Sequence, residues 1–149
     1  MDFSNGVIRM DYRELDGALA VGPQIMPEDV ATLAAKGIRM LVCNRPDGEE
    51  ADQPEFAAIE AAAEGQGIAT VYLPVTGQTM GPEVAARFRE ILDAADGPVF
   101  AYCRSGTRTT YLWSIGELLN GRAPAEVVAL AGRAGYDVSA LAQRFSSPG

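Results

Sequence analysis

The chain has 149 residues, of which 12 are Lys or Arg, 20 are Asp or Glu, and 48% are apolar. This composition is that of one globular domain of ordinary size, long enough to bury a core without a disulfide or a metal. The formal net charge of −8 argues against nucleic acid or an anionic membrane as the main partner, because both bind positively charged surfaces.

The chain contains no His, which excludes Ser-His-Asp and Cys-His catalysis and the metal sites that need imidazole. Its two cysteines, Cys43 and Cys103, are too few for a four-cysteine zinc site and are typical of a reducing compartment. The first residues lack the features of a signal peptide, and no run of roughly 18 apolar residues occurs. We therefore expect a cytoplasmic protein that needs no metal or cofactor.

From residue 18 onward, apolar segments of strand length alternate with Ala-rich helical segments. In chain order we predict a strand at 18–22, a helix at 27–37, a strand at 38–43, a helix at 54–65, a strand at 68–73, a helix at 82–95, a strand at 98–102, a helix at 107–119, and two final helices beginning near residues 123 and 138. Pro27 suits the start of the first helix, and Gly37 suits its C-terminal cap.

The predicted strands show little alternation of apolar and polar residues. This indicates a mainly parallel sheet with helices on both faces. We predict one domain of the three-layer α/β class over residues 1–149, with a core at 17–134, a central sheet of about four to five strands and a disordered tail at 146–149. In such sheets ligands bind beyond the carboxyl ends of the strands, here after Cys43, Leu73 and Tyr102.

The segment after the last predicted strand carries the strongest chemical signal. Cys103 follows the strand directly, a short loop with Gly106 comes next, and a helix begins near Thr107. Such a loop directs backbone N–H groups at an anion, and the helix start and the guanidinium of Arg108 add positive charge. A cysteine placed there is expected to be a reactive thiolate. The alternative is a buried structural cysteine beside an ordinary turn.

Other polar residues near this loop have two readings each. Arg104 contributes its backbone to the loop, while its side chain can be solvated. Ser105 and Thr109 can donate hydrogen bonds to the thiolate or cap the following helix. Arg45, after the second predicted strand, can bind the substrate anion or form a surface ion pair with Glu49 or Glu50.

These motifs resemble known families. The run Cys-Arg-Ser-Gly-Thr-Arg at 103–108 resembles the active loop of rhodanese-type sulfurtransferases, and its place between strand and helix resembles protein tyrosine and dual-specificity phosphatases. Together with Asn-Arg-Pro-Asp-Gly-Glu-Glu at 44–50, it resembles the bacterial beta-lactamase-hydrolase-like, phosphatase-like domain family, also labelled a sulfur transferase family. The resemblance covers about residues 17–134 and implies a protein-tyrosine-phosphatase-like fold. It also implies a persulfide dioxygenase as a candidate partner, because that family's domain can be fused to one.

The family's two labels imply two activities, phosphate-ester cleavage and sulfur transfer, and the residues favour sulfur transfer. Phosphatases of this type carry C-x-x-G-x-x-R, whereas Arg108 comes one position early and Thr109 stands where that Arg would be. The shorter loop suits a single sulfur better than a phosphoryl group. Phosphate-ester cleavage also needs an acid, and residues 74–81 contain no carboxylate. Asp47 is the best substitute acid, although Arg-Pro-Asp-Gly is also typical of a plain turn.

We therefore hypothesise a sulfurtransferase that carries sulfane sulfur as a Cys103 persulfide, with thiosulfate or glutathione persulfide as donor. The alternative is a cysteine-dependent phosphatase that forms a Cys103 phosphoenzyme from a phosphate ester. A non-catalytic anion-binding or redox module is the second alternative. In every case the site comprises Cys103, Arg108 and Asp47 as catalytic candidates, with Arg45, Arg104, Ser105, Gly106, Thr107 and Thr109 as substrate-binding candidates. A disulfide between Cys43 and Cys103 is a further hypothesis, because Cys43 ends a strand whose carboxyl end should lie on the same edge of the sheet as Cys103.

Overall fold

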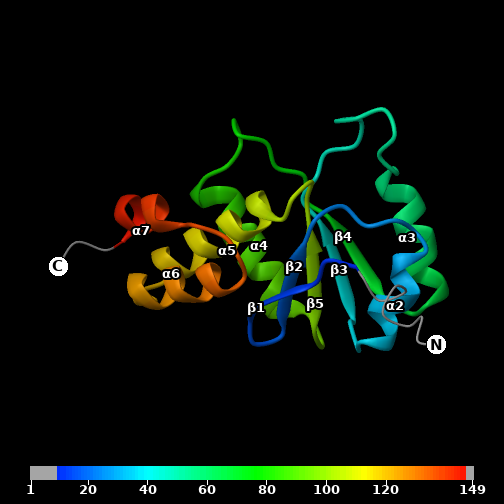
Figure 1. Cartoon of the computed structure of the whole chain (residues 1–149), viewed down its shortest axis with the longest axis horizontal. Helices are drawn as coiled ribbons and strands as arrows, with labels where there is room; N and C mark the ends of the chain where they lie inside the picture. The colour runs from blue at the N-terminus through cyan, green and yellow to red at the C-terminus, as the bar shows by residue number, and fades with distance from the viewer. Residues whose placement is uncertain (1–9, 147–149) are drawn as a thin grey trace, which may run out of the picture.

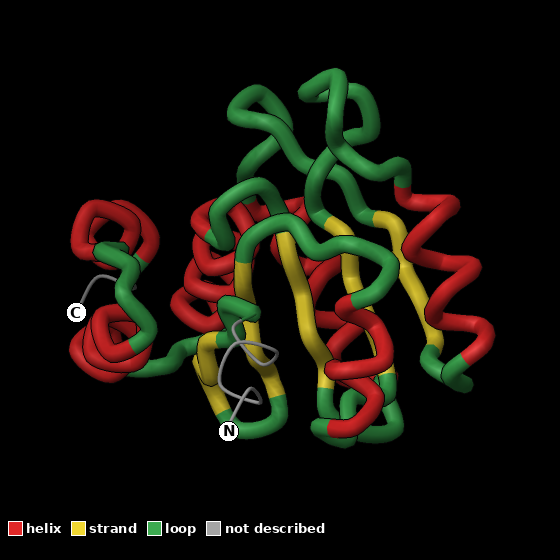
Figure 2. Tube along the Cα trace, turned by 45° about the vertical axis from the view of Figure 1, so that its right-hand side comes forward, coloured by secondary structure: helices red, strands yellow, loops and turns green. Residues whose placement is uncertain are grey.

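A five-stranded sheet forms the centre of the computed structural model, which describes residues 10–146 (Figure 1). The strand order is β1-β2-β5-β3-β4. The strands are β1 (Arg13–Asp16), β2 (Leu19–Gly22), β3 (Met40–Cys43), β4 (Ala69–Tyr72) and β5 (Val99–Tyr102). β1 is antiparallel to β2, and all other pairings are parallel. The parallel strands therefore end at one common edge, where the loops gather (Figure 2).

Helices cover both faces of the sheet (Figures 1 and 2). One face carries α2 (Asp29–Ala35) and α3 (Phe56–Gly65), and the other carries α4 (Pro82–Ala94) and α5 (Thr107–Leu119). The last two helices, α6 (Pro124–Arg133) and α7 (Ser139–Phe145), pack against α5.

The alternating side chains of β5 divide the core into two apolar clusters. Val99 and Ala101 belong to the cluster under α4 and α5, and Phe100 and Tyr102 belong to the cluster under α2 and α3. All four side chains are buried because β5 is the central strand and both of its faces are covered. This burial fixes the direction in which the chain leaves the sheet after Tyr102.

The predicted fold class, a three-layer α/β arrangement around a mainly parallel sheet, is confirmed. The prediction missed β1, whose sequence Arg-Glu-Leu-Asp has one apolar residue, Leu15. β1 is an edge strand that is joined to the following strand, β2, by a tight hairpin, so only Leu15 needs to be buried. Residues 147–149 of the predicted tail lie outside the described residues. Within residues 10–146, no helix combines the length and the apolar character needed to cross a membrane.

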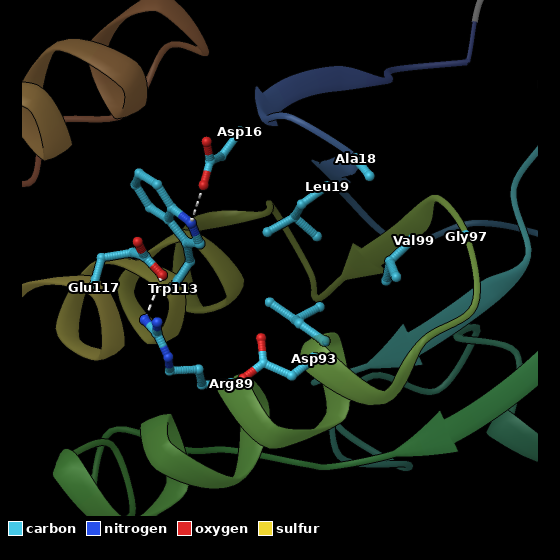
Figure 3. Close-up of a pocket in the computed structure, with 10 residues that line it drawn as sticks. Asp16, Ala18, Leu19, Arg89, Asp93, Gly97, Val99, Trp113 and Glu117 are labelled. Atoms are coloured by element: carbon cyan, nitrogen blue, oxygen red, sulfur yellow. Dashed lines mark hydrogen bonds and ion pairs between the residues drawn. The ribbon is translucent and has the colours of Figure 1, made fainter. Parts of the chain in front are cut away.

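A cavity of about 190 Å³ lies at the opposite end of the sheet, where β2 and β5 begin (Figure 3). Leu19, Val99 and Trp113 supply much of its wall. Two charged residues that line it form an ion pair, in which Arg89 donates to Glu117 at 2.8 Å. No residue of the 103–108 loop lines this cavity.

Candidate active site

The loop after β5 curls around the sulfur of Cys103. Cys103 is fully buried, and its Sγ accepts a hydrogen bond from the backbone N–H of Gly106 at 3.1 Å. Gly106 immediately precedes α5 and has φ +90°, the left-handed region that favours glycine. Because of this conformation, the loop directs an N–H group at the sulfur at the start of a helix, as the sequence predicts for an anion-binding loop.

Hydrogen bonds to two backbone carbonyl groups of the loop hold it in this shape. The hydroxyl of Tyr136 donates to the carbonyl of Ser105 at 3.0 Å, and the hydroxyl of Thr110 donates to the carbonyl of Gly106 at 2.8 Å. A Cβ atom placed on Gly106 would overlap the Tyr136 hydroxyl. The loop is therefore supported by a residue that follows α6, far along the chain.

Replacing Gly106 with Ala is expected to destabilise the protein more than replacing Gly121 with Ala. Both glycines have φ +90°, but a Cβ on Gly121 would meet no atom within 4 Å. Both variants therefore lose about 1–2 kcal/mol to backbone strain, and Gly106→Ala loses a further amount, on the order of 1–3 kcal/mol, to the clash. Urea unfolding of the two variants measures the difference. Equal losses would mean that the contact with Tyr136 does not constrain the loop.

Arg108 is held by a carboxylate from another loop. Its Nη1 donates to Glu49 Oε2 at 2.7 Å, and its Nη2 donates to Glu49 Oε1 at 2.8 Å. Nη1 also donates to the carbonyl of Val75 at 3.0 Å. These bonds use three of the five guanidinium N–H groups. Within residues 10–146, no oxygen accepts from the Nε–H or from the second Nη2–H, and Arg108 also interacts with the sulfur of Cys103. The Nε/Nη2 edge of a guanidinium has the geometry that binds two oxygens of one phosphate group.

Arg45 is buried beneath Glu49 and Glu50. Its Nε donates to Glu49 at 3.0 Å, its Nη2 donates to Glu50 at 2.7 Å, and its Nη1 donates to the side chain of Gln24 at 3.1 Å. Only 2% of Arg45 is exposed, so the expected ion pairs form in the interior and not at the surface. These acceptors bind three of the five N–H groups of the Arg45 guanidinium. The role of Arg45 in binding the substrate anion stays a prediction.

The five charged residues form one chain of alternating sign. It runs Arg108–Glu49–Arg45–Glu50–Arg104, since Glu50 also accepts from Arg104 at 3.3 Å. The hydrogen bonds with Arg108, followed by those with Arg45, lower the pKa of Glu49 to about 2. The pKa of Arg108 is raised, mainly by Glu49 and additionally by the sulfur of Cys103. Both groups are therefore charged at neutral pH.

Asp47 lies on the same loop but is engaged elsewhere. Its Oδ1 accepts a hydrogen bond from the backbone N–H of Phe56, the first residue of α3, at 2.8 Å. Its own N–H donates to the hydroxyl of Tyr72 at 2.9 Å. The carboxylate thus caps α3 within a turn, which is the alternative that the Arg-Pro-Asp-Gly run also predicts.

The hydroxyl groups of the predicted site divide into two sets. Ser105 and Thr107 bond to each other at 3.0 Å near the surface of the loop. Thr109 is buried and donates to the side-chain carbonyl of Asn44 at 2.8 Å, and the amide of Asn44 donates to the carbonyl of Leu73 at 2.9 Å. Thr109 therefore ties α5 to the ends of β3 and β4.

Five residues that position the loop were not predicted to do so: Gln24, Asn44, Val75, Thr110 and Tyr136. The strand-end rule points to Asn44, because it directly follows β3. No local pattern marks Tyr136, which contacts the loop from 31 residues away.

Residues 11–120 match the sequence model of a family described as "Beta-lactamase hydrolase-like protein, phosphatase-like domain". The chain belongs to this family. The expected resemblance is thus confirmed, with the matched residues beginning and ending somewhat earlier than 17–134. A relative from Agrobacterium fabrum, named beta-lactamase hydrolase-like protein, is 38% identical over 104 residues. That match covers 70% of this chain and only 24% of the relative.

Solved structures with this fold are phosphatases by their descriptions. A "putative phosphatase" from Neisseria meningitidis is 34% identical and superimposes with a TM-score of 0.83, covering 92% of this chain and 97% of that one. The core catalytic domain of the PP-IP phosphatase SIW14 from S. cerevisiae is 18% identical with a TM-score of 0.65, covering 91% of this chain and 82% of that one. The second likeness shows the fold alone. The protein-tyrosine-phosphatase-like fold of this phosphatase-like domain is therefore confirmed.

The second cysteine of the phosphatase-like domain lies in a different environment. Cys43 is packed in the apolar cluster under α2 and α3, and its thiol donates to the carbonyl of Arg45 at 3.3 Å. Burial raises the pKa of Cys43. Both cysteines are free thiols, and a disulfide between them stays a hypothesis.

Iodoacetate is expected to alkylate Cys103 in preference to Cys43. The reagent is an anion, which the loop is expected to bind, and Arg104 and Ser105 beside Cys103 are exposed. The raised pKa of Cys43 keeps that thiol protonated. Peptide mass mapping after limited alkylation measures the ratio, and inorganic phosphate should slow the labelling of Cys103 alone. Faster labelling of Cys43 would contradict the assignment of Cys103 as the reactive thiol.

Glu49 is expected to stabilise the phosphatase-like domain in a pH-dependent way. Because its pKa falls from 4.5 to about 2 on folding, its contribution is fully present above pH 4.5 and is lost as the pH falls through about 2. The difference in unfolding free energy between the wild type and Glu49→Gln should therefore shrink between pH 5 and pH 2. Urea unfolding over this range, with Glu83→Gln as a control on an exposed helix start, tests it. A difference independent of pH would rule out the ion pair as its source.

Proposed function

We propose that the domain is a cysteine-dependent phosphatase of the protein-tyrosine-phosphatase type. The observation that carries this proposal is the Nε/Nη2 edge of Arg108, from which no oxygen of the described residues accepts at Nε or at the second Nη2–H, in the loop that surrounds the sulfur of Cys103. A phosphoryl group placed against Cys103 would find a backbone donor from Gly106 and two donors from Arg108. Hydrogen-bond donors fixed in advance around developing negative charge are the usual source of catalysis at such centres.

The proposed reaction has two steps. The Cys103 thiolate attacks phosphorus, so that an S–P bond forms and the bond between phosphorus and the leaving oxygen breaks, its electron pair departing with that oxygen. Water then attacks phosphorus in the phosphocysteine, and the S–P bond breaks. Inorganic phosphate leaves, and the Cys103 thiolate is regenerated. Arg108 and the loop N–H groups hold the phosphoryl oxygens in both steps.

Glu49 and Arg45 act as positioning residues in this proposal. Glu49 binds the end of the Arg108 guanidinium and leaves its side edge available to the substrate. Arg45 holds Glu49 in turn from beneath. This support matters because a misplacement of about 1 Å in a catalytic group can reduce the rate 10²-fold.

Sulfur transfer is the second candidate, favoured by the spacing between Cys103 and Arg108, which is one residue shorter than in phosphatases of this type. The same thiolate would attack the sulfane sulfur of thiosulfate or glutathione persulfide and form a Cys103 persulfide. The comparisons support phosphate esters as substrates of this fold and give no support to sulfur donors or to a persulfide dioxygenase partner. For this reason we place phosphate transfer first.

The two functions are separated by one parallel assay. The purified protein is incubated with 4-nitrophenyl phosphate in one arm and with thiosulfate and cyanide in the other, with Cys103→Ser as the blank. A phosphatase releases inorganic phosphate catalytically and gains the mass of one phosphoryl group on Cys103 after acid quenching. Thiocyanate formation and a mass gain of one sulfur, without phosphate release, would reverse the order of the two functions.

A further inference from the structure

The loop after β4 offers no carboxylate to the site. Residues 74–81 contain neither Asp nor Glu, although this loop contacts Arg108 through the carbonyl of Val75. Thr76 and Thr79 close the loop into a turn, in which the N–H of Thr76 donates to the hydroxyl of Thr79 at 2.9 Å. Cleavage of an unactivated ester by a thiolate needs an acid that protonates the departing oxygen. The segment with carboxylates that contacts the Cys103 loop is 47–50, through Glu49 and Glu50.

The two glutamates of that segment are committed to arginines. Glu49 accepts two hydrogen bonds from Arg108 and one from Arg45, and these cations keep its pKa near 2, so that it carries no proton at neutral pH. Glu50 accepts from Arg45 with one oxygen and from Arg104 with the other. Both carboxylate oxygens of Glu50 are therefore engaged with guanidinium groups.

The third carboxylate of the segment is committed to a helix. Asp47 accepts from the first N–H of α3, and its backbone is tied to Tyr72. The Oδ1 atom of Asp47 is therefore engaged in capping the helix. To donate a proton at the Cys103 loop, Asp47 would have to leave the cap.

We propose that the domain acts on phosphate compounds whose leaving group is stable as an anion, namely phosphoanhydrides, acyl phosphates and activated aryl phosphates, and not on alkyl phosphate esters. This inference rests on the proposed phosphatase function. In the first step the S–P bond forms while the P–O bond breaks, and the leaving oxygen departs as a free anion that takes its proton later from water. A phosphate leaving group, with a second pKa of about 6, meets this condition, whereas tyrosine, with a pKa of about 10, meets it poorly and serine does not.

The dependence of the rate on the leaving group tests the proposal. kcat/KM, which reports the thiolate attack, is measured for a series of aryl phosphates from nitrophenyl to methoxyphenyl, together with a nucleoside diphosphate, acetyl phosphate and an alkyl phosphate. We expect kcat/KM to fall by roughly three- to tenfold for each unit by which the leaving-group pKa rises, because no proton transfer compensates the developing charge. The measurement detects a proton donor wherever in the protein it lies.

Two variants with the carboxylate replaced make the test specific. Asp47→Asn keeps an oxygen that can cap α3 but cannot act as a carboxylic acid, and Asp52→Asn makes the same change on an exposed neighbour in the 47–55 loop. We expect both variants to change kcat/KM by less than about twofold for every member of the series. A loss of about 10² or more that is confined to poor leaving groups would identify that residue as the acid and overturn the inference.

The outcomes distinguish a failure of the proposed substrate class from a failure of the proposed phosphatase function. Turnover that varies by less than about twofold per unit of leaving-group pKa would overturn the substrate class and leave the phosphatase function standing. Faster turnover of the alkyl phosphate than of the two anhydrides would do the same. The absence of phosphate release from every compound, nitrophenyl phosphate included, would overturn both.

Discussion

Replacement of Cys103 with Ser is expected to reduce kcat/KM for 4-nitrophenyl phosphate by at least about 10⁴-fold. A serine hydroxyl has nearly the size of the thiol and can keep the hydrogen bond from the Gly106 N–H, so the loop should keep its shape. It has no neighbouring base to remove its proton, because the chain has no His and the nearby carboxylates are paired with arginines. Stopped assays for phosphate, with far-UV circular dichroism of both proteins, measure the effect.

Cys43→Ser is the matched control for this experiment. It removes the other thiol of the chain. That thiol lies in the apolar cluster under α2 and α3 and donates its hydrogen bond to the carbonyl of Arg45. We expect activity within about threefold of the wild type, with some loss of stability because a hydroxyl replaces a buried sulfur. Activity of Cys103→Ser within tenfold of the wild type would exclude Cys103 as the nucleophile.

Arg108→Lys is expected to lower kcat by about 10²–10³-fold although it keeps the positive charge. The guanidinium binds Glu49 through both Nη atoms and still offers the Nε/Nη2 edge to a phosphoryl group. A lysine ammonium is a single point of donation and cannot make both bidentate contacts together. Steady-state kinetics with 4-nitrophenyl phosphate measure the loss.

Arg89→Lys provides the same substitution away from the loop. Arg89 pairs with Glu117 at the cavity beside the starts of β2 and β5 (Figure 3). We expect its kcat to stay within about twofold of the wild type, as is usual for a partly exposed ion pair far from the chemistry. Near-normal kcat in Arg108→Lys would mean that the guanidinium fork is not used by the substrate.

Most of the fold was predictable because its signals are local. The central strand, Val99–Tyr102, is a short apolar run between turn residues, and two of the helices begin at prolines, Pro82 and Pro124. β1 escaped prediction because an edge strand needs to bury only one side chain. A four-residue run with three charged residues gives no period that distinguishes it from a loop.

The loop around Cys103 was predictable for the same reason, since strand, Cys, Gly and Arg follow one another within a few residues. The contacts that orient Arg108 were not. Glu49 is 59 residues away in sequence, and only the parallel arrangement of β3 and β5 brings their carboxyl ends together. The burial of Arg45 was not predictable either, because the sequence shows its glutamate neighbours but not that Gln24, 21 residues away, accepts a hydrogen bond from Nη1.

The Tyr136 contact bears on where this domain ends. The residues that define the family stop at 120, yet the hydroxyl that supports the carbonyl of Ser105 comes from a residue beyond α6. A fragment cut at residue 120 would keep every residue of the loop itself and lose both Tyr136 and the helices that pack on α5. The smallest unit able to preserve the geometry around Cys103 therefore extends past the family boundary, through α7. A fragment that is excised from a protein several times longer than this chain should therefore include the segment that corresponds to α7.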